Sequence, residues 1–574
     1  MAIHEIKVEI NVAVPMRDGT VLRADIYRPN VDQPLPTLVV RLPYDKGNPS
    51  VVMMSCDPMR FARNGYAVVI QDCRGCHASD GEWYPHRDDA LDGYDTVEWA
   101  AAQPWSNQKV GMYGGSYLGT VQWMSAHAQP PHLVAMAPMV SPSSARNMMF
   151  KGGVFQLKTV QFLTLGLMAM HARRYHAPSE LPGLMREVLN AFDNREREAS
   201  YLPLRAWPVG KRSRLMNFYF DFLEHPTNDE YWRELEFAVY EKTVVPTCIV
   251  CSWYDFTSET GGLASYTGMK TRGGTEHARK NVKLIIGPWV HGVELNSVVG
   301  EIDFGILSTG AATDLIGVYL RWFDYWLKGI DNGVIDEPPV RIFVMGDNVW
   351  RNENEWPLAR AAYANYYLHS GGNANGISGD GFLTTEVAEK EPQDIFHYDP
   401  LDPVPTLGGR LIRDAGAIDQ SEIEQRKDVL VYSTQPLVAD LEVTGPIMMK
   451  LYAQSSAPDT DFTAKLVDVW PNGKAYILAD GITRARYRDS DEFPSLIEPD
   501  RVYEYTIDMM GTSNVFKAGH RIRLEISSSN FPKYDRNPNT GHDIGVDAET
   551  RVARQTIFHD RARPSHVVLP LIPR

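Results

Sequence analysis

The chain lacks any long uncharged apolar stretch. No segment approaches the roughly 18 consecutive apolar residues of a membrane-spanning helix, and the N-terminal MAIHEIKVEINVAVPMRDG carries charges every few positions, unlike a signal peptide. Basic residues are also scarce, since 57 lysines and arginines stand against 72 aspartates and glutamates, a formal net charge of −15. This excess of negative charge gives no positive electrostatic potential that would attract a polyphosphate, which argues against nucleic acid as a partner. We therefore expect a soluble cytoplasmic protein with no nucleic-acid and no membrane partner.

Cysteine is scarce too, with five residues in 574, too few for a disulfide scaffold. Four of them form two C-x-x-C pairs, Cys73/Cys76 and Cys248/Cys251, a spacing typical of zinc sites. The second pair lies in PTCIVCSWYD, which has the composition of a buried strand, where residues three apart point to opposite faces. The two thiols could then not ligate one ion. We expect no metal and no other cofactor, and we interpret the cysteines as small apolar packing residues.

Short β-type runs alternate with amphipathic stretches over the first 141 residues. The segments TLVVRLPY, YAVVIQD and LVAMAPMVS have the composition of buried strands, and DDALDGYDTVEWAAAQ has a helical pattern. This alternation predicts a parallel sheet covered by helices. The pattern stops after Ser141 and resumes at VVPTCIVCSWYD. We therefore predict an α/β core in two parts, residues 1–145 and 242–350, around an insert of residues 146–241.

The insert and the C-terminal part differ from the core in composition. GGVFQLKTVQFLTLGLMAMHARRYH is rich in helix formers with Met, Leu and Phe, so the insert is predicted to be a helical cap. From residue 351 to 574 the chain consists of short strand-like runs separated by Gly, Pro, Asn and Asp turns. That spacing predicts an antiparallel β-sandwich.

The segment GMYGGSYLG packs four glycines around one hydroxyl, that of Ser116. A strand-like run precedes it and a helical pattern follows, which is the context of a nucleophile elbow, where small neighbours let sheet and helix approach closely. The usual G-x-S-x-G pattern would place glycine at Leu118, whereas here the glycine is Gly119. A serine hydroxyl is a poor nucleophile by itself, so this interpretation requires a base, an orienting carboxylate and an oxyanion hole.

Candidates for the base and the carboxylate follow later strands in the order of an α/β-hydrolase. Asp255 ends the run CIVCSWYD, and His291 ends LIIGPWVH. Both are predicted at the carboxyl edge of the sheet, where open α/β proteins hold their ligands. The three residues together predict a triad in which Ser116 attacks, His291 transfers the proton and Asp255 orients the imidazole.

The segments PMRDGTVLRADIYRP, RLPYDK, QDCRG, GGSYLG, WYD, GPWVH and SSSNFPKYDRNPNTG are spread over nearly the whole chain. They show a resemblance to the cocaine esterase (CocE/NonD) family of α/β-hydrolases, which also contains acylases, α-amino acid ester hydrolases and X-prolyl dipeptidyl peptidases. It implies a hydrolase core, a helical cap and a C-terminal jelly roll, and the family's G-x-S-Y-x-G elbow accommodates Leu118. It also implies an oxyanion hole made of the Tyr44 hydroxyl and the backbone N–H of Tyr117.

The substrate pocket is less determined by the sequence. Apolar cap residues such as Phe150 suit an apolar or aromatic acyl group, with Phe256 beside Asp255 and with Leu411 and Ile412 of the sandwich as further candidates. An alternative is an acyl group with a distal carboxylate, such as glutaryl, held by cap cations. These cations would be Arg146, Lys151 and Lys158.

Amide-cleaving relatives would need carboxylates near the acyl site to hold a substrate ammonium. The stretch between Ser116 and Glu180 contains no Asp or Glu, although Asp45 and Glu259 remain available. We therefore favour a serine esterase over an acylase or X-Pro-type peptidase. A carbohydrate-binding protein with an inactive core is a third option, which the set of Tyr44 and the three triad residues disfavours. Oligomeric state stays open, with a homodimer among the options.

Overall fold

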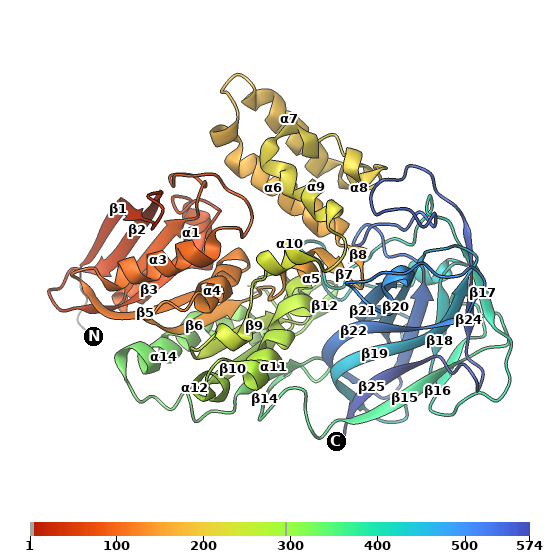
Figure 1. Ribbon diagram of the computed structural model, residues 1–574. Coiled ribbons are helices and arrows are strands. Elements are labelled where there is room, and N and C mark those ends of the chain that lie inside the picture. Colours follow the sequence, from red (N-terminus) through yellow and green to blue (C-terminus); the bar gives the residue numbers. More distant parts are fainter. Residues whose placement is uncertain (1–4, 293–295) are drawn as a thin grey trace.

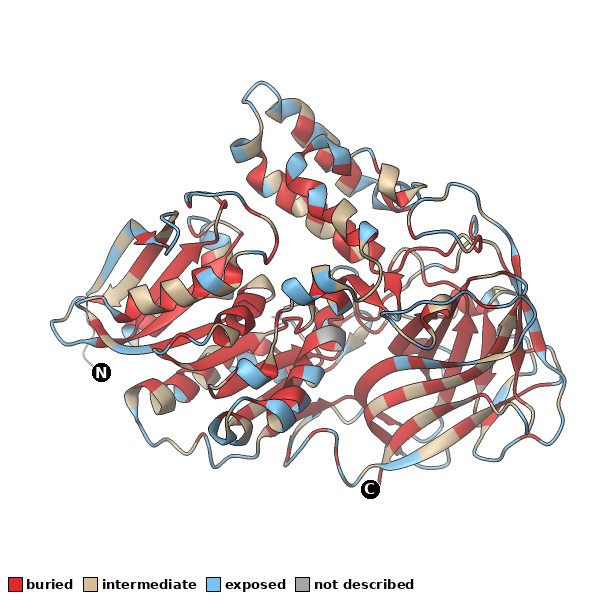
Figure 2. Ribbon diagram, in the orientation of Figure 1, coloured by how far each residue is buried: buried red, intermediate tan, exposed pale blue. Residues whose placement is uncertain are grey.

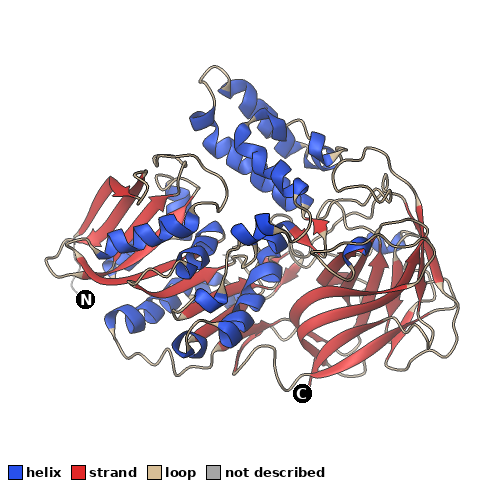
Figure 3. Cartoon of the chain, viewed as in Figure 1, coloured by secondary structure: helices blue, strands red, loops and turns tan. Residues whose placement is uncertain are grey.

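The computed structural model describes residues 5–292 and 296–574, without the side chains of residues 53–55 and 259–260. The chain folds into a helix-covered sheet, a helical segment above it and a C-terminal β-sandwich (Figures 1 and 3). This is the predicted fold class, an α/β-hydrolase core with an inserted cap and a jelly-roll sandwich. Within the described residues, no helix combines the length and apolar character needed to cross a bilayer.

The core is a ten-stranded sheet with the order β1-β2-β4-β3-β5-β6-β9-β10-β13-β14. The strands from β4 to β13 are parallel, and β1, β2 and β14 add antiparallel edges. In chain order, their bounds are Ile6–Pro15 (β1), Val21–Pro29 (β2), Leu35–Leu42 (β3), Ala67–Asp72 (β4), Ser106–Gly115 (β5), Leu133–Met139 (β6), Thr247–Ser252 (β9), Val282–Gly287 (β10), Val340–Val344 (β13) and Val349–Glu353 (β14).

Helices cover both faces of this sheet because its strands are apolar on both sides. Val39 of β3 packs in one core cluster and its neighbour Val40 in another, as the alternation of strand side chains requires. The first cluster includes side chains of α3 (Asp89–Ala101), α4 (Tyr117–His127) and α11 (Leu263–Arg272). The second includes side chains of α2 (Pro58–Arg63) and α14 (Leu315–Lys328). Figure 2 shows the parallel strands of the core as largely buried.

Between β6 and β9 the chain leaves the sheet and forms the cap, which lies above the sheet and reaches toward the sandwich (Figure 1). A two-stranded hairpin within it, β7 (Phe150–Lys151) and β8 (Val154–Phe155), contacts the sandwich, where the Arg484 N–H donates to the Gly152 carbonyl at 2.8 Å. The helices are α5 (Ala145–Met149), α6 (Leu157–Tyr175), α7 (Leu181–Asp193), α8 (Arg195–Ala199), α9 (Asn217–Glu224) and α10 (Glu230–Glu234).

The C-terminal part is an eleven-stranded β-sandwich around its own apolar cluster. It begins at β15, whereas the predicted boundary at residue 350 falls inside β14, which pairs with β13 and completes the core sheet. The strands are β15 (Ala362–His369), β16 (Phe382–Thr384), β17 (Asp394–Tyr398), β18 (Leu430–Ser433), β19 (Leu441–Ser455), β20 (Asp461–Val469), β21 (Ala475–Arg484), β22 (Tyr503–Phe516), β23 (Arg521–Ser527), β24 (Ala553–Phe558) and β25 (His566–Ile572).

Candidate active site

Ser116 occupies the sharp turn between β5 and α4, with φ 60° and ψ −126°. Glycines surround it because side chains would collide: a Cβ on Gly119 would lie 2.6 Å from Cβ of Ser141, and one on Gly114 would lie 2.8 Å from Cβ of Leu118. Leu118 itself is buried in the core. The close approach therefore falls at Gly119, which explains why the elbow departs from G-x-S-x-G.

The structure brings Ser116, His291 and Asp255 into one hydrogen-bonded chain. Nε2 of His291 lies 2.9 Å from Oγ of Ser116, and Nδ1 lies 3.1 Å from each carboxylate oxygen of Asp255. Asp255 is fully buried and accepts a 2.8 Å hydrogen bond from the Thr257 N–H. With Nδ1–H donating to the carboxylate, Nε2 is free to accept the serine proton.

Backbone hydrogen bonds connect the loop after β9 with the loop after β10. The Trp253 N–H donates to the Gly287 carbonyl at 2.8 Å, and the Tyr254 N–H donates to the Trp289 carbonyl at 3.0 Å. These bonds lie just before Asp255 and His291 in the chain, so they fix the backbones that carry the carboxylate and the imidazole relative to each other.

Two hydrogen-bond donors stand beside the serine, at the positions expected for an oxyanion hole. The Tyr44 side chain hydrogen-bonds with Ser116, and withdrawal of its hydroxyl from water raises the pKa of Tyr44 to about 12. The hydroxyl therefore stays protonated and able to donate at neutral pH. The N–H of Tyr117 belongs to the first turn of α4, where amides lack intrahelical partners and the helix dipole favours negative charge. Together they suit an oxygen that develops charge next to Ser116.

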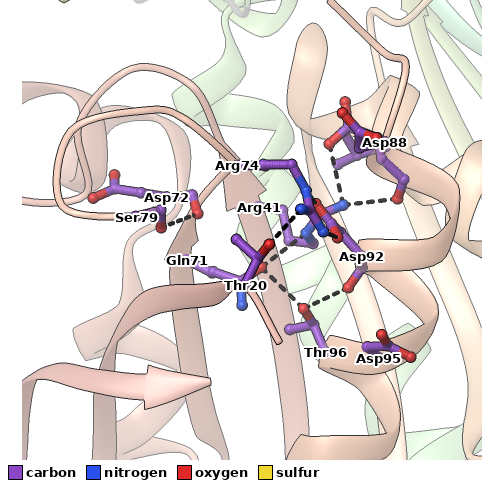
Figure 4. Close-up of polar contacts among 12 residues, drawn as sticks. Thr20, Arg41, Gln71, Asp72, Arg74, Ser79, Asp88, Asp92, Asp95 and Thr96 are labelled. Carbon is purple, nitrogen blue, oxygen red and sulfur yellow. Dashed lines mark hydrogen bonds and ion pairs between the residues drawn. The ribbon is translucent and has the colours of Figure 1, made fainter. Parts of the chain in front are cut away.

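A buried polar network supports the elbow from below. The Tyr117 hydroxyl donates to Asp89 at 2.6 Å, and Arg41 pairs with Asp89 at 3.2 Å. Figure 4 shows more of this network: Arg41 of β3 donates to Gln71 of β4, and Arg74 pairs with Asp92 of α3 at 2.6 Å. These ionic contacts hold the first turn of α3 under the ring of Tyr117.

Sequence analysis missed a support for Tyr44. Asp72 is fully buried at the end of β4, accepts a 2.8 Å hydrogen bond from the backbone N–H of Lys46, and lies 3.5 Å from the Lys46 ammonium. Asp25 lies 3.4 Å from the same ammonium. Lys46 follows Tyr44 by two residues, so its contacts with Asp72 and Asp25 anchor the loop that carries Tyr44. The signal was present, since QDCRG places an aspartate at a strand end.

Two cavities meet at Ser116. The inner cavity runs under the cap between core and α6, and its walls include Trp83, Met149, Val160, Leu163, Phe218 and Phe222. Among the described residues, none that lines it is Asp, Glu, Lys or Arg. The second cavity, the mouth, is wide and opens to solvent past His291, with the ion pair Arg60–Asp314 and the segment 412–415 on its rim.

The predicted pocket residues divide between these walls and the core behind them. Phe256 lines the inner cavity, with its ring 4.9 Å from that of His291, and Ile412 lines the mouth. The structure does not bring Phe150 and Leu411 to either cavity, and Phe150 packs instead against Phe155 and Trp232. Apolar residues at helical spacing show the same sequence pattern whether they line a cavity or pack in the core, so the sequence could not separate the two cases.

The cap cations are engaged elsewhere. Arg146 pairs with Asp491 at 3.4 Å, Lys151 with Asp508 at 3.0 Å and Lys158 with Asp414 at 2.9 Å. These pairs fasten the cap to the sandwich, and none of the three cations lines either cavity, so the structure does not assemble a glutaryl site from them. Of the two remaining carboxylates, Asp45 lies outside both cavities, and the Glu259 side chain is outside the described residues.

The C-x-x-C pairs are buried free thiols. Cys248 and Cys251 both lie on β9 but pack in the clusters on opposite faces of the sheet. Burial raises the pKa of Cys248 to about 12 and those of Cys73 and Cys76 well above the usual range. Within the described part of the chain, no group of three His, Cys, Asp or Glu side chains is arranged to hold a metal ion.

Comparison with known proteins places these features in a family. Residues 18–293 match the X-Pro dipeptidyl-peptidase (S15) family, and residues 332–568 match the X-Pro dipeptidyl-peptidase C-terminal non-catalytic domain. The chain is 40% identical to a cocaine esterase of Rhodococcus sp. (strain MB1 Bresler), over 98% of each chain.

Among solved structures, the chain resembles an α-amino acid ester hydrolase, with TM-score 0.81 and 26% identity over 99% of this chain and 97% of that one. It also resembles an aminopeptidase from a Thaumarchaeota archaeon, with TM-score 0.80 and 25% identity over 100% and 97%.

Proposed function

The chain belongs to the cocaine esterase family and is a serine ester hydrolase, and from this premise we propose that Ser116, His291 and Asp255 cleave esters of uncharged, apolar acyl groups. The observation that carries the proposal is the hydrogen-bonded chain that ends at Ser116, next to a cavity that no Asp, Glu, Lys or Arg among the described residues lines.

The proposed reaction proceeds through an acyl-enzyme. Oγ of Ser116 attacks the ester carbonyl while Nε2 of His291 takes the hydroxyl proton, and Asp255 holds the imidazole and stabilises its charged form. The Tyr44 hydroxyl and the Tyr117 N–H donate to the oxygen that becomes negative. The tetrahedral species collapses when His291 passes the proton to the leaving alcohol. Water then attacks the acyl-enzyme, losing its proton to His291, and the acid leaves as Ser116 is restored.

The walls of the inner cavity support the acyl class. Aromatic and aliphatic side chains surround the space next to Ser116. His86, which also lines it, has its pKa lowered to about 4 because it is buried, so its imidazole is neutral at pH 7. A substrate carboxylate or ammonium would lose its hydration there without gaining a charged partner from the described residues, at a cost of several kcal/mol. The leaving alcohol would occupy the mouth, which is wide and carries charged groups on its rim.

The same cavity disfavours the amide-cleaving alternative. The names of two similar structures, an α-amino acid ester hydrolase and an aminopeptidase, point to substrates with an ammonium group. Such a group needs carboxylates at the acyl site, and the described residues supply none in the inner cavity. We further infer a cytoplasmic enzyme of small molecules, since five buried free thiols suit a reducing compartment and the acidic charge disfavours nucleic acid.

The test is a matched series of p-nitrophenyl esters that differ only in the acyl group: butyryl, benzoyl, glutaryl monoester and alanyl. We expect butyryl or benzoyl to have the highest kcat/KM, with both charged esters lower by roughly 10²-fold or more, the penalty of an unpaired charge in an apolar site. A glutaryl or alanyl ester cleaved as well as butyryl would refute the acyl class. Absence of turnover for all four would refute the esterase itself.

A further inference from the structure

A loop of the sandwich reaches into the catalytic core. Residues 409–416 form a closed turn, because the Gly409 and Gly416 backbones exchange hydrogen bonds of 2.8 and 2.9 Å. The tip of this turn, residues 412–415, lines the mouth of the active site. Arg410 lies at the base of the turn and is 1% exposed. A side chain that retains its charge in so dry a place needs several partners.

Arg410 finds such partners on both sides of the boundary between core and sandwich. Its Nε–H donates to the Trp253 carbonyl at 2.9 Å, and its Nη groups donate to the Met509 and Gly511 carbonyls. Met509 and Gly511 belong to β22 of the sandwich. Trp253 follows β9 of the core and precedes Asp255 by two residues. One guanidinium thus joins the loop of the proposed catalytic acid to a strand of another domain.

The contacts of the acid loop are shared between the two domains. On the core side, the N–H groups of Trp253 and Tyr254 donate to carbonyls of the loop that carries His291. On the sandwich side, Arg410 donates to the Trp253 carbonyl, and the Tyr254 hydroxyl donates to the Ile477 carbonyl at 3.3 Å. The backbone before Asp255 is therefore clamped from both directions. Loss of the Arg410 donors would leave a buried carbonyl unpaired, which favours movement of the loop toward another donor.

We propose that Arg410 is a positioning residue for Asp255, so that the sandwich is part of the catalytic apparatus. The guanidinium touches neither substrate nor the reacting atoms. It holds the Trp253 carbonyl and thereby sets the place of the Asp255 carboxylate against Nδ1 of His291. This inference rests on the proposed role of Asp255.

The first test compares Arg410→Met with the wild type. Methionine keeps the length and apolar stem but removes every donor. A shift of a catalytic group by about 1 Å can cost up to 10²-fold, so we expect kcat for p-nitrophenyl butyrate to fall by about 10- to 100-fold with KM within about threefold. The number of sites that a fluorophosphonate titrates should stay at one per chain. A purely structural role would instead lower that number and leave the rate per titrated site unchanged.

A matched control removes another buried arginine of the sandwich. Arg523 pairs with Glu424 and Ser433 inside the sandwich. Arg523→Met should lower the melting temperature without changing the rate per titrated site. If both variants lose the same rate per site, the effect is general loosening and the proposal fails.

A double-mutant cycle tests whether the loss of rate in Arg410→Met acts through Asp255. In an Asp255→Ala background, Arg410→Met should cost less than about threefold, because the group it positions is gone. Full additivity of the two losses would overturn the inference while leaving Asp255 as the acid. If Asp255→Ala alone had no effect, the proposed triad would fail instead.

A conservative variant covers the case in which Arg410→Met does not fold. Arg410→Lys keeps a charge and can satisfy one carbonyl, and we expect an intermediate rate per titrated site. An unchanged rate per site with a lowered melting temperature would contradict a positioning role.

Discussion

The hydroxyl of Tyr117 donates a 2.6 Å hydrogen bond to Asp89 and so points away from the serine that precedes Tyr117 in the chain. The ring stacks on His86 at 4.2 Å, and burial raises the pKa of Tyr117 well above its usual range. One residue therefore serves in two ways. Its backbone N–H is placed at the proposed oxyanion site, while its side chain fixes the elbow to the first turn of α3.

Replacement of Ser116 by alanine should abolish turnover. Without the nucleophile, kcat for p-nitrophenyl butyrate should fall by up to about 10⁶-fold, leaving the residual rate that binding and the oxyanion donors supply. Peptide mapping of wild-type enzyme treated with a fluorophosphonate should find one adduct, on Ser116. An adduct on another residue, or activity retained in the variant, would contradict the assignment.

The two tyrosines of the proposed oxyanion hole should differ in their response to phenylalanine. Tyr44→Phe removes a donor and should lower kcat by about 10²- to 10³-fold. Tyr117→Phe keeps the backbone N–H and should cost less than about tenfold. Because the pKa of Tyr44 is about 12, its hydroxyl stays a donor below that pH, so its ionisation should cause no loss of activity up to pH 10. Equal losses in the two variants would refute this division of roles.

Narrowing the inner cavity should select against large acyl groups. Val160 is buried and lines only this cavity of the two at Ser116, among the described residues. Val160→Phe should lower kcat/KM for the benzoyl ester by about 10- to 200-fold relative to the acetyl ester, the range that pocket size differences produce. Steady-state kinetics with the two p-nitrophenyl esters measures the ratio. An unchanged ratio would place the acyl group elsewhere.

Metal removal should not affect the enzyme. The pKa of the Cys248 thiol is raised to about 12 by burial, so this thiol is protonated at neutral pH and a poor zinc ligand. Dialysis against EDTA should leave kcat unchanged, and elemental analysis should find substoichiometric zinc. Loss of activity on dialysis that zinc restores would contradict this expectation.

His171 should make the fold sensitive to acid. Burial lowers its pKa to about 3, against about 6.5 in an unfolded chain. Between these values the unfolded state binds a proton that the native state does not, so stability should be unaffected above pH 6.5 and fall as pH decreases below it. His171 stacks on Trp83, and His171→Phe keeps a ring there. Between pH 7.5 and pH 5, the melting temperature of the variant should fall less than that of the wild type. An equal fall in both proteins would refute the role of His171 in acid sensitivity.

Much of the architecture follows from local patterns. Periodicity predicted the helix-covered parallel sheet, the inserted helices and the sandwich, because buried parallel strands, amphipathic helices and turn-bounded strands each have a distinct composition. The end of the core could not be located this way. β13 and β14 have the same strand pattern as the sandwich, and only their hydrogen bonds to β10 and to each other assign them to the core sheet.

In the candidate site, too, some features follow from the sequence and others only from the tertiary structure. The sequence by itself determined the order and spacing of Ser116, Asp255 and His291 at strand ends, because the carboxyl ends of parallel strands meet at one edge. Tertiary structure alone decided which apolar side chains line the inner cavity, that Arg146, Lys151 and Lys158 pair with carboxylates, and that Arg410 holds the Trp253 carbonyl. These contacts join residues that are remote in the chain and on different domains. Local composition does not determine which distant atoms a side chain contacts.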